Sequence, residues 1–272
     1  MGYATRPKKA LGQNFLVNPG IAPKMVERSG ITGDFGIIEI GAGRGALTKE
    51  LVLAAKKVVA IEIDGGLAAE LEDRLGDSRN LRILRRDVLA TDFSELIASE
   101  LKNMPVAIFG NLPYYITSPI IMKLLEARLP VEMIVVMVQK EAARRLAAKE
   151  ASRESGAITL AVRYYSVPEI LFDVSPGSFS PVPKVTSSVL KLTVRKSPSA
   201  APKDEALMFG IIRAAFSQRR KMAVSAVSSG MVLEKAKVGA AFSLCGISLA
   251  ARAEQLSLSD FAALSDCLSV PE

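Results

Sequence analysis

Four consecutive residues, Asn111-Leu112-Pro113-Tyr114, have the types and spacing needed to hold an aromatic amine for chemistry. They follow the apolar run 106–110, which reads as a short buried strand. The Asn111 side chain and the backbone carbonyl of residue 112 can accept hydrogen bonds from both N–H groups of an amine, while Tyr114 stacks on its ring. This favours a pyramidal nitrogen whose lone pair faces a methyl donor, so catalysis rests on positioning. The alternative is a structural Asn-Pro turn with aromatics in the core.

A glycine-rich segment forms the second candidate site. Gly41, Gly43 and Gly45 follow the apolar run 36–40 and open an expected helix. Glycines at such a turn let backbone N–H groups approach a ligand closely. The G-x-G-x-G spacing differs from the G-x-G-x-x-G of dinucleotide-binding turns, and Asn-Leu-Pro-Tyr has no role in hydride transfer. Both features favour S-adenosylmethionine, although a tight structural turn explains the glycines alone.

Two acids stand where the next strands are expected to end. Glu62 comes 21 residues after Gly41, a position from which an acid binds ribose hydroxyls. Asp87 follows the run 81–84 and can accept from an adenine amine, or it can be a helix cap or a solvated loop acid. Because the carboxyl ends of parallel strands share one edge, these acids and the glycines are expected to meet there.

Three other segments each allow a functional and a structural interpretation. Asn14 and Leu16 lie in a basic N-terminal arm that can fold over a cofactor, although the residues alone favour an ordinary cap turn. Phe179, in a Pro-rich loop, suits either the second face of a base sandwich or a core position. The cluster 216–221 suits contacts to phosphates or a solvated helix end.

Composition narrows the chemistry. Histidine is absent from all 272 residues, which excludes imidazole catalysis and His ligands. Cys245 and Cys267 lack C-x-x-C spacing, so we expect neither a zinc site nor a disulfide framework, in keeping with a reduced cytoplasmic protein. No apolar run reaches the ~18 residues of a membrane span, and we expect no secretory signal in the N-terminal residues.

Charge is distributed unevenly along the chain. The formal net charge is +7, with a basic excess in residues 1–28 and 191–221 and an acidic excess in 34–103. Basic ends on an acidic centre suit a polyanionic partner, or simply a solvated basic surface.

Short apolar runs alternate with amphipathic stretches, which predicts an α/β fold with a mostly parallel sheet covered by helices on both faces. Strands are expected at 36–40, 58–63, 81–84, 106–109 and 133–138, and helices around 45–55, 66–76, 92–101 and 117–127. Segments 157–165 and 187–194 are interpreted as strands that extend the sheet as an antiparallel edge. With 197–202 as a linker, the predicted domains are 1–196 and an all-helical 203–272.

Taken in order, these motifs resemble those of the KsgA-type ribosomal RNA adenine dimethylases over nearly the whole chain. The matching segments are 11–16, 39–45, Glu62, Asp87, 111–119, 139–141, 176–185 and 216–221. The resemblance implies a Rossmann-like methyltransferase domain with a small helical domain. It also implies transfer of two methyl groups from S-adenosylmethionine to N6 of each of two adjacent adenines. These adenines lie in the 3′-terminal hairpin loop of small-subunit (16S) rRNA and are modified during ribosome biogenesis.

The resemblance also implies roles for individual residues and for partners. The expected cofactor-binding residues are Asn14, Leu16, Gly41, Glu62, Asp87 and Asn111. The expected catalytic residues, which hold the target base, are Asn111, Leu112, Tyr114 and Phe179. RNA contacts are expected from Lys8, Lys9, Lys184, Arg219, Arg220 and Lys221. The expected product of the cofactor is S-adenosylhomocysteine, and no metal is expected. The expected partner is rRNA within a pre-ribosomal 30S particle, bound by a cytoplasmic monomer away from any membrane.

Two departures and two rival functions accompany this resemblance. Ala42 and Arg44 stand where the family usually has Pro and Leu, which loosens the turn and brings a cation to the mouth of the cofactor site. The first rival function is that of a large-subunit rRNA adenine methylase, which shares the main motifs. The Phe179 loop and the 218–221 cluster favour the small-subunit type instead. A non-catalytic nucleic-acid-binding factor is disfavoured because Asn111 and both strand-end acids are intact.

Overall fold

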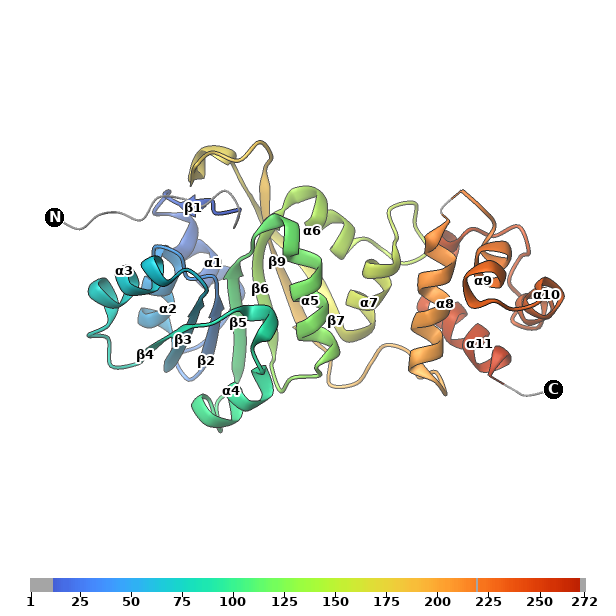
Figure 1. The fold of residues 1–272 in the computed structure, drawn as a ribbon, viewed down its shortest axis with the longest axis horizontal. Helices are drawn as coiled ribbons and strands as arrows, with labels where there is room; N and C mark the ends of the chain where they lie inside the picture. Colours follow the sequence, from blue (N-terminus) through green and yellow to red (C-terminus); the bar gives the residue numbers. More distant parts are fainter. Residues whose placement is uncertain (1–11, 219, 270–272) are drawn as a thin grey trace. The chain divides into compact units, whose positions relative to one another are not determined.

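The structure is a computed structural model that describes residues 12–218 and 220–269. Its large sheet contains β2 (Gly36–Ile40), β3 (Lys57–Glu62), β4 (Leu81–Arg85), β5 (Val106–Asn111), β6 (Met133–Gln139), β7 (Ser166–Val174) and β9 (Ser187–Val194). The strand order is β4-β3-β2-β5-β6-β9-β7 (Figure 1). In this order, neighbouring strands from β4 through β3, β2 and β5 to β6 pair in parallel. Strand β9 pairs antiparallel with β6. The predicted mostly parallel sheet, with 187–194 as an antiparallel addition, is confirmed.

The connections between the parallel strands are helical, as the alternating pattern predicts. They comprise α2 (Ala46–Ala54), α3 (Gly65–Leu75), α4 (Phe93–Glu100) and α5 (Thr117–Glu126), with the short 3₁₀ turns η2 (Val88–Ala90) and η3 (Tyr114–Ile116). Helix α1 (Ile21–Ser29) precedes β2, and α6 (Lys140–Ala147) follows β6. Strands β2, β5 and β6 are buried almost throughout, which explains their continuous apolar sequences. Helices flank the sheet on both faces (Figure 1).

A second, two-stranded sheet fixes the N-terminal segment. Strand β1 (Phe15–Leu16) pairs antiparallel with β8 (Phe179–Ser180), which follows the 3₁₀ turn η4 (Pro176–Ser178). A Cβ atom added at Gly43 would lie 3.4 Å from Cδ1 of Phe15, so this ring packs directly on the glycine turn. The segment before α1 is therefore held against the carboxyl edge of the large sheet.

The interpretation of 157–165 as a strand is wrong. These residues form the helix α7 (Ala157–Tyr165), and the strand follows it as β7. The hydroxyls of Tyr164 and Tyr165 donate to the two carboxylate oxygens of Glu205, at 2.8 and 2.7 Å. Consecutive side chains of a strand point to opposite faces, whereas in a helix they diverge less and can reach one partner. Because α7 is buried nearly all round, its sequence lacks the polar face that identifies a helix.

The chain divides into two compact units. One contains residues 1–143 and 167–194, and the other contains 144–166 and 195–272. The predicted boundary differs from this division over 144–166, because α7 packs with α8 (Glu205–Ser217). The second unit also contains α9 (Ala223–Met231), α10 (Lys235–Leu244), the 3₁₀ turn η5 (Ala253–Gln255) and α11 (Leu258–Leu268). Within the described residues, no helix is both long and apolar enough to cross a bilayer.

Candidate active site

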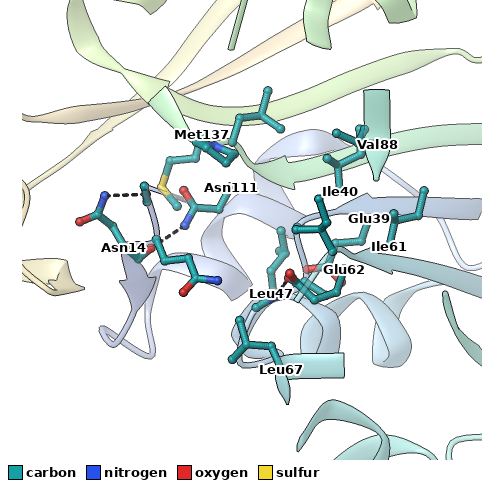
Figure 2. A pocket seen from close by; sticks show the side chains of 18 of the residues that line it. Asn14, Glu39, Ile40, Leu47, Ile61, Glu62, Leu67, Val88, Asn111 and Met137 are labelled. Carbon is teal, nitrogen blue, oxygen red and sulfur yellow. Dashed lines mark hydrogen bonds between the residues drawn. The ribbon is translucent and has the colours of Figure 1, made fainter. Parts of the chain in front are cut away.

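A cavity of about 300 Å³ opens at the carboxyl edge of the parallel strands, entirely within the first unit. The lining contains Asn14, Leu16, Gly41, Glu62, Asp87, Asn111, Leu112 and Tyr114. Figure 2 shows how side chains from several strands converge there. The structure therefore brings together all the sequence-predicted cofactor-binding residues and three of the four predicted catalytic residues.

The glycine turn is built around a buried carboxylate. Gly41, Gly43 and Gly45 have φ values of 73°, 55° and 77°, which L side chains rarely adopt. The Gly43 N–H donates to Oε2 of Glu62 at 2.8 Å, and the Asp64 N–H donates to Oε1 at 2.9 Å. Burial raises the pKa of Glu62, while these backbone hydrogen bonds oppose that rise. Glu62 is thus fixed at the floor of the cavity, with further acceptor capacity for hydroxyls.

A second buried acid, Glu39, lies at the site and is not among the residues predicted from the sequence. It lies in the middle of the apolar strand β2, lines the cavity and is only 1% exposed. Burial, aided by the nearby charge of Glu62, raises its pKa to about 7. Its Oε2 atom accepts no hydrogen bond from any described residue. A lone acid inside an otherwise apolar strand was the available signal, because such a group needs a partner or a ligand.

Asp87 caps a 3₁₀ turn, and its predicted role as an amine acceptor stays a prediction. Its Oδ1 atom accepts from the Leu89 N–H at 2.8 Å and caps η2, as the structural alternative expects. The residue is exposed and also lines the cavity. A carboxylate oxygen has more than one acceptor site, so a cap bond leaves capacity for an amine.

The orientation of Asn111 is determined by the N-terminal segment. Its amide nitrogen donates to the backbone carbonyl of Asn14 at 3.0 Å (Figure 2). Because a carbonyl can only accept, the nitrogen end of the amide must face Asn14, and Oδ1 is the end left for another donor. The neighbouring Leu112 N–H donates to the Met137 carbonyl at 3.1 Å, which anchors the loop to β6.

Tyr114 lines the cavity, and its hydroxyl contacts Ser187, which is not among the residues predicted from the sequence. Its hydroxyl lies 2.7 Å from the Oγ atom of Ser187, which is fully buried at the start of β9. Burial raises the pKa of Tyr114. A ring that lines a cavity and whose hydroxyl is fixed is suited to stacking against a planar ligand. The Ser187 contact joins distant segments, so no local pattern indicated it.

The structure does not bring Phe179 to the cavity. Its side chain is 2% exposed and belongs to the core cluster that includes Met25 and Val174. Of the two interpretations, the structure has the core one, because the β1–β8 pairing turns the ring inward. The aromatic at the cavity mouth is instead Tyr115, which is 60% exposed and lies among the lining residues.

The predicted RNA contacts fall on both units. Lys184 is exposed in the first unit, and Arg220 and Lys221 are exposed after α8 in the second. Exposure is compatible with phosphate contacts and with a solvated surface. Lys8, Lys9 and Arg219 lie outside the described residues. Within the described part of the chain, no group of three Cys, Asp or Glu residues is arranged to hold a metal ion.

Comparisons with known proteins show the family of the chain. The sequence profile of the family described as ribosomal RNA adenine dimethylase matches residues 4–269. A "Ribosomal RNA small subunit methyltransferase A" of Geobacillus thermodenitrificans is 45% identical over 270 residues, covering 98% of this chain and 92% of that protein. The protein of the same name from Shouchella clausii is 45% identical over 264 residues, covering 96% and 89%.

Solved structures extend the comparison. A dimethyladenosine transferase from Plasmodium falciparum superposes with a TM-score of 0.75 at 26% identity, covering 92% of this chain and 95% of that one. The 23S rRNA methyltransferase ErmE has a TM-score of 0.72 at 24% identity, covering 94% and 100%, which establishes a shared fold.

Proposed function

Because the chain belongs to the ribosomal RNA adenine dimethylase family, we propose that its cavity binds S-adenosylmethionine and the N6 amine of an rRNA adenine. The chain is an S-adenosylmethionine-dependent rRNA methyltransferase, like the small-subunit methyltransferases A it is similar to. Its substrate is two adjacent adenines in the 3′-terminal hairpin loop of 16S rRNA, each receiving two methyl groups during ribosome biogenesis. We further propose that it acts as a cytoplasmic monomer on a pre-ribosomal 30S particle and without a metal.

The cavity residues fit this cofactor on physical grounds. The positive-φ glycines allow backbone to approach a ligand, and the fixed Glu62 carboxylate can accept from ribose hydroxyls. The buried Glu39 carboxyl has an oxygen without a protein partner, which suits a donor or a cation in the ligand. Asp87 can accept from the exocyclic amine of the cofactor's adenine. When bound, S-adenosylmethionine supplies an electrophilic methyl group on a sulfonium.

The chain's own residues then act on the target amine. Oδ1 of Asn111 and the backbone carbonyl of Leu112 accept its two N–H groups, and Tyr114 stacks on the base. These contacts aim the nitrogen lone pair without a strong base, in keeping with a sequence that has no histidine. The methylated nitrogen releases a proton to solvent. A monomethylated amine retains one N–H, so the second transfer uses only one of the two acceptors.

The observation that carries this proposal is the hydrogen bond from Asn111 to the Asn14 carbonyl, because it leaves the amide oxygen as the acceptor. The direct test incubates the protein with labelled S-adenosylmethionine and unmodified small subunits, then locates N6,N6-dimethyladenine by primer extension. Large subunits form a parallel reaction. Modification of large subunits alone would support the rival specificity. No incorporation by a folded protein that binds the cofactor would support a non-catalytic role.

A further inference from the structure

The second unit contains a pair of thiols that the methyltransferase site does not use. Cys245 is the C-cap residue directly after α10, and Cys267 lies in the last turn of α11. Their Sγ atoms are 3.4 Å apart, and both side chains are half-exposed. These are the only two cysteines of the chain. Sequence spacing alone gave no reason to pair them, because the fold brings together positions 22 residues apart.

Regular backbone hydrogen bonds hold the helix ends at both thiols, and at the end of α11 the Ser269 N–H donates to the Ser265 carbonyl at 3.0 Å. The Cys245 N–H donates to the Ala241 carbonyl at 3.0 Å, and the Ile247 N–H donates to the Phe242 carbonyl at 2.8 Å, which closes the end of α10. Gly246 supports this end with a φ of 69°. Helices α10 and α11 pack against each other within one unit. The proximity of the two thiols therefore follows from packed helices.

We propose that Cys245 and Cys267 form a redox-sensitive dithiol that closes reversibly to an intramolecular disulfide when the protein meets a low-molecular-weight disulfide oxidant. In a reducing compartment the pair stays as thiols, because disulfides there are transient and usually redox-sensing. The inference does not depend on the methyltransferase activity, and it adds a modification site in the other unit of the chain.

The chemistry proceeds by two thiol–disulfide exchanges. The Cys267 thiolate attacks one sulfur of the oxidant, forms a mixed disulfide and releases one thiolate. The Cys245 thiol then loses its proton and attacks the Cys267 sulfur, which forms the internal bond and expels the second thiolate. Two cysteines lose two electrons, and the oxidant is reduced to two thiols. Burial, together with the adjacent Cys267, raises the pKa of Cys245 to about 11, so Cys245 is assigned the later step.

Closure would connect the ends of α10 and α11 and restrict the unfolded chain between them. The oxidised protein should therefore melt at a higher temperature than the reduced protein, and dithiothreitol should reverse the difference. The cavity lies in the first unit, so cofactor affinity should stay the same in both states.

The experiment treats the full-length protein with oxidised glutathione and measures its intact mass after blocking of free thiols. We expect a species that has lost two hydrogen atoms and takes up no blocking reagent. Cys245→Ser should instead stop at a glutathione adduct on Cys267. Two independent glutathione adducts on the wild-type protein, or two freely titrating thiols, would overturn the proposal.

A second measurement tests the pairing without any oxidation. An aryl arsenoxide condenses with two adjacent thiols to form a dithioarsenite and one water molecule. The reduced wild-type protein should retain this reagent against a large excess of monothiol, whereas Cys245→Ser and Cys267→Ser should release it. Equal release from the wild-type protein and from both variants would show that the thiols do not lie together in solution.

Discussion

The amide nitrogen of Asn111 donates to the backbone carbonyl of Asn14 at 3.0 Å, so a segment near the N-terminus determines which end of this amide faces the cavity. Strand β1, which begins at the next residue, is itself paired with β8. We infer that the proposed acceptor for the target amine is therefore oriented by two segments that are distant from it in the sequence, the N-terminal segment with β1 and the strand β8. The 12–16 segment therefore bears on the chemistry through this contact, in addition to lining the cavity.

Substitution of Asn111 tests this relationship. Asn111→Ala removes one preorganised hydrogen-bond partner and should lower single-turnover methyl transfer by at least about 10²-fold, with only modest loss of cofactor affinity. Asn111→Asp keeps an oxygen acceptor but places a carboxylate oxygen against the Asn14 carbonyl, so it should be similarly impaired. Transfer can be followed with labelled cofactor and unmodified small subunits, and cofactor affinity by calorimetry. Wild-type turnover in Asn111→Asp would contradict the orienting role of Asn14.

The Tyr114–Ser187 contact predicts a coupled pair of substitutions. Ser187→Ala and Tyr114→Phe each remove the same hydrogen bond, worth about 1 kcal/mol, and each should lower kcat/KM roughly fivefold. The double variant should be no worse than either single variant, because the bond can be lost only once. Ser187→Thr retains a hydroxyl and is the matched control. Independent effects that simply add in the double variant would rule out the coupling.

The position of Phe179 predicts an effect on stability. Phe179→Ala empties a site in the core and should lower the free energy of unfolding by about 3–5 kcal/mol, measured by denaturant titration. Phe179→Leu keeps most of the volume and should retain most of both stability and turnover. A stable Phe179→Leu protein with greatly reduced turnover would favour the base-stacking role that the family resemblance implies.

Much of the site could be predicted because its residues follow strands whose sequences are unmistakable. Gly41, Glu62 and Asn111 each come at the end of a continuous apolar run, and parallel topology alone brings such ends to one edge. These site residues could therefore be predicted because they lie at strand ends, which sequence patterns locate well.

The other features of the fold and the site could not be predicted, because they depend on which elements pack against one another. Local sequence does not encode this packing. Helix α7 has the apolar, β-branched sequence of a strand because it is buried on most sides. Phe179 occupies the core because β8 pairs with β1, a contact between segments more than 160 positions apart. Ser187 becomes significant only through its contact with Tyr114, which is known once the sheet is assembled. Glu39 could be singled out as a lone acid in an apolar strand, but its raised pKa depends on burial in the assembled sheet.

The basic residues predict a strong salt dependence of RNA binding. Binding dominated by phosphate contacts loses affinity linearly with the logarithm of salt concentration, in proportion to the number of contacts. Arg220→Gln combined with Lys221→Gln should weaken binding of small-subunit rRNA and reduce this slope by about one for each contact removed. Glu126→Gln, an exposed change that removes no positive charge, is a suitable control. A flat binding curve for the wild-type protein between low and physiological salt would exclude a phosphate-dominated interface.

The buried Glu39 predicts a specific pH dependence of stability in the cofactor-free protein. Its pKa is raised from 4.5 to about 7 in the folded state, so its contribution to stability is complete below about pH 4.5 and is lost as the pH rises through about 7. Glu39→Gln removes the cost of ionising a buried group. Its stability relative to wild type should improve by about 2–3 kcal/mol between pH 5 and pH 8, measured by denaturant unfolding. The exposed Glu126→Gln is the control and should show little such change. If the difference in unfolding free energy between Glu39→Gln and wild type did not change with pH, Glu39 would not titrate in this range.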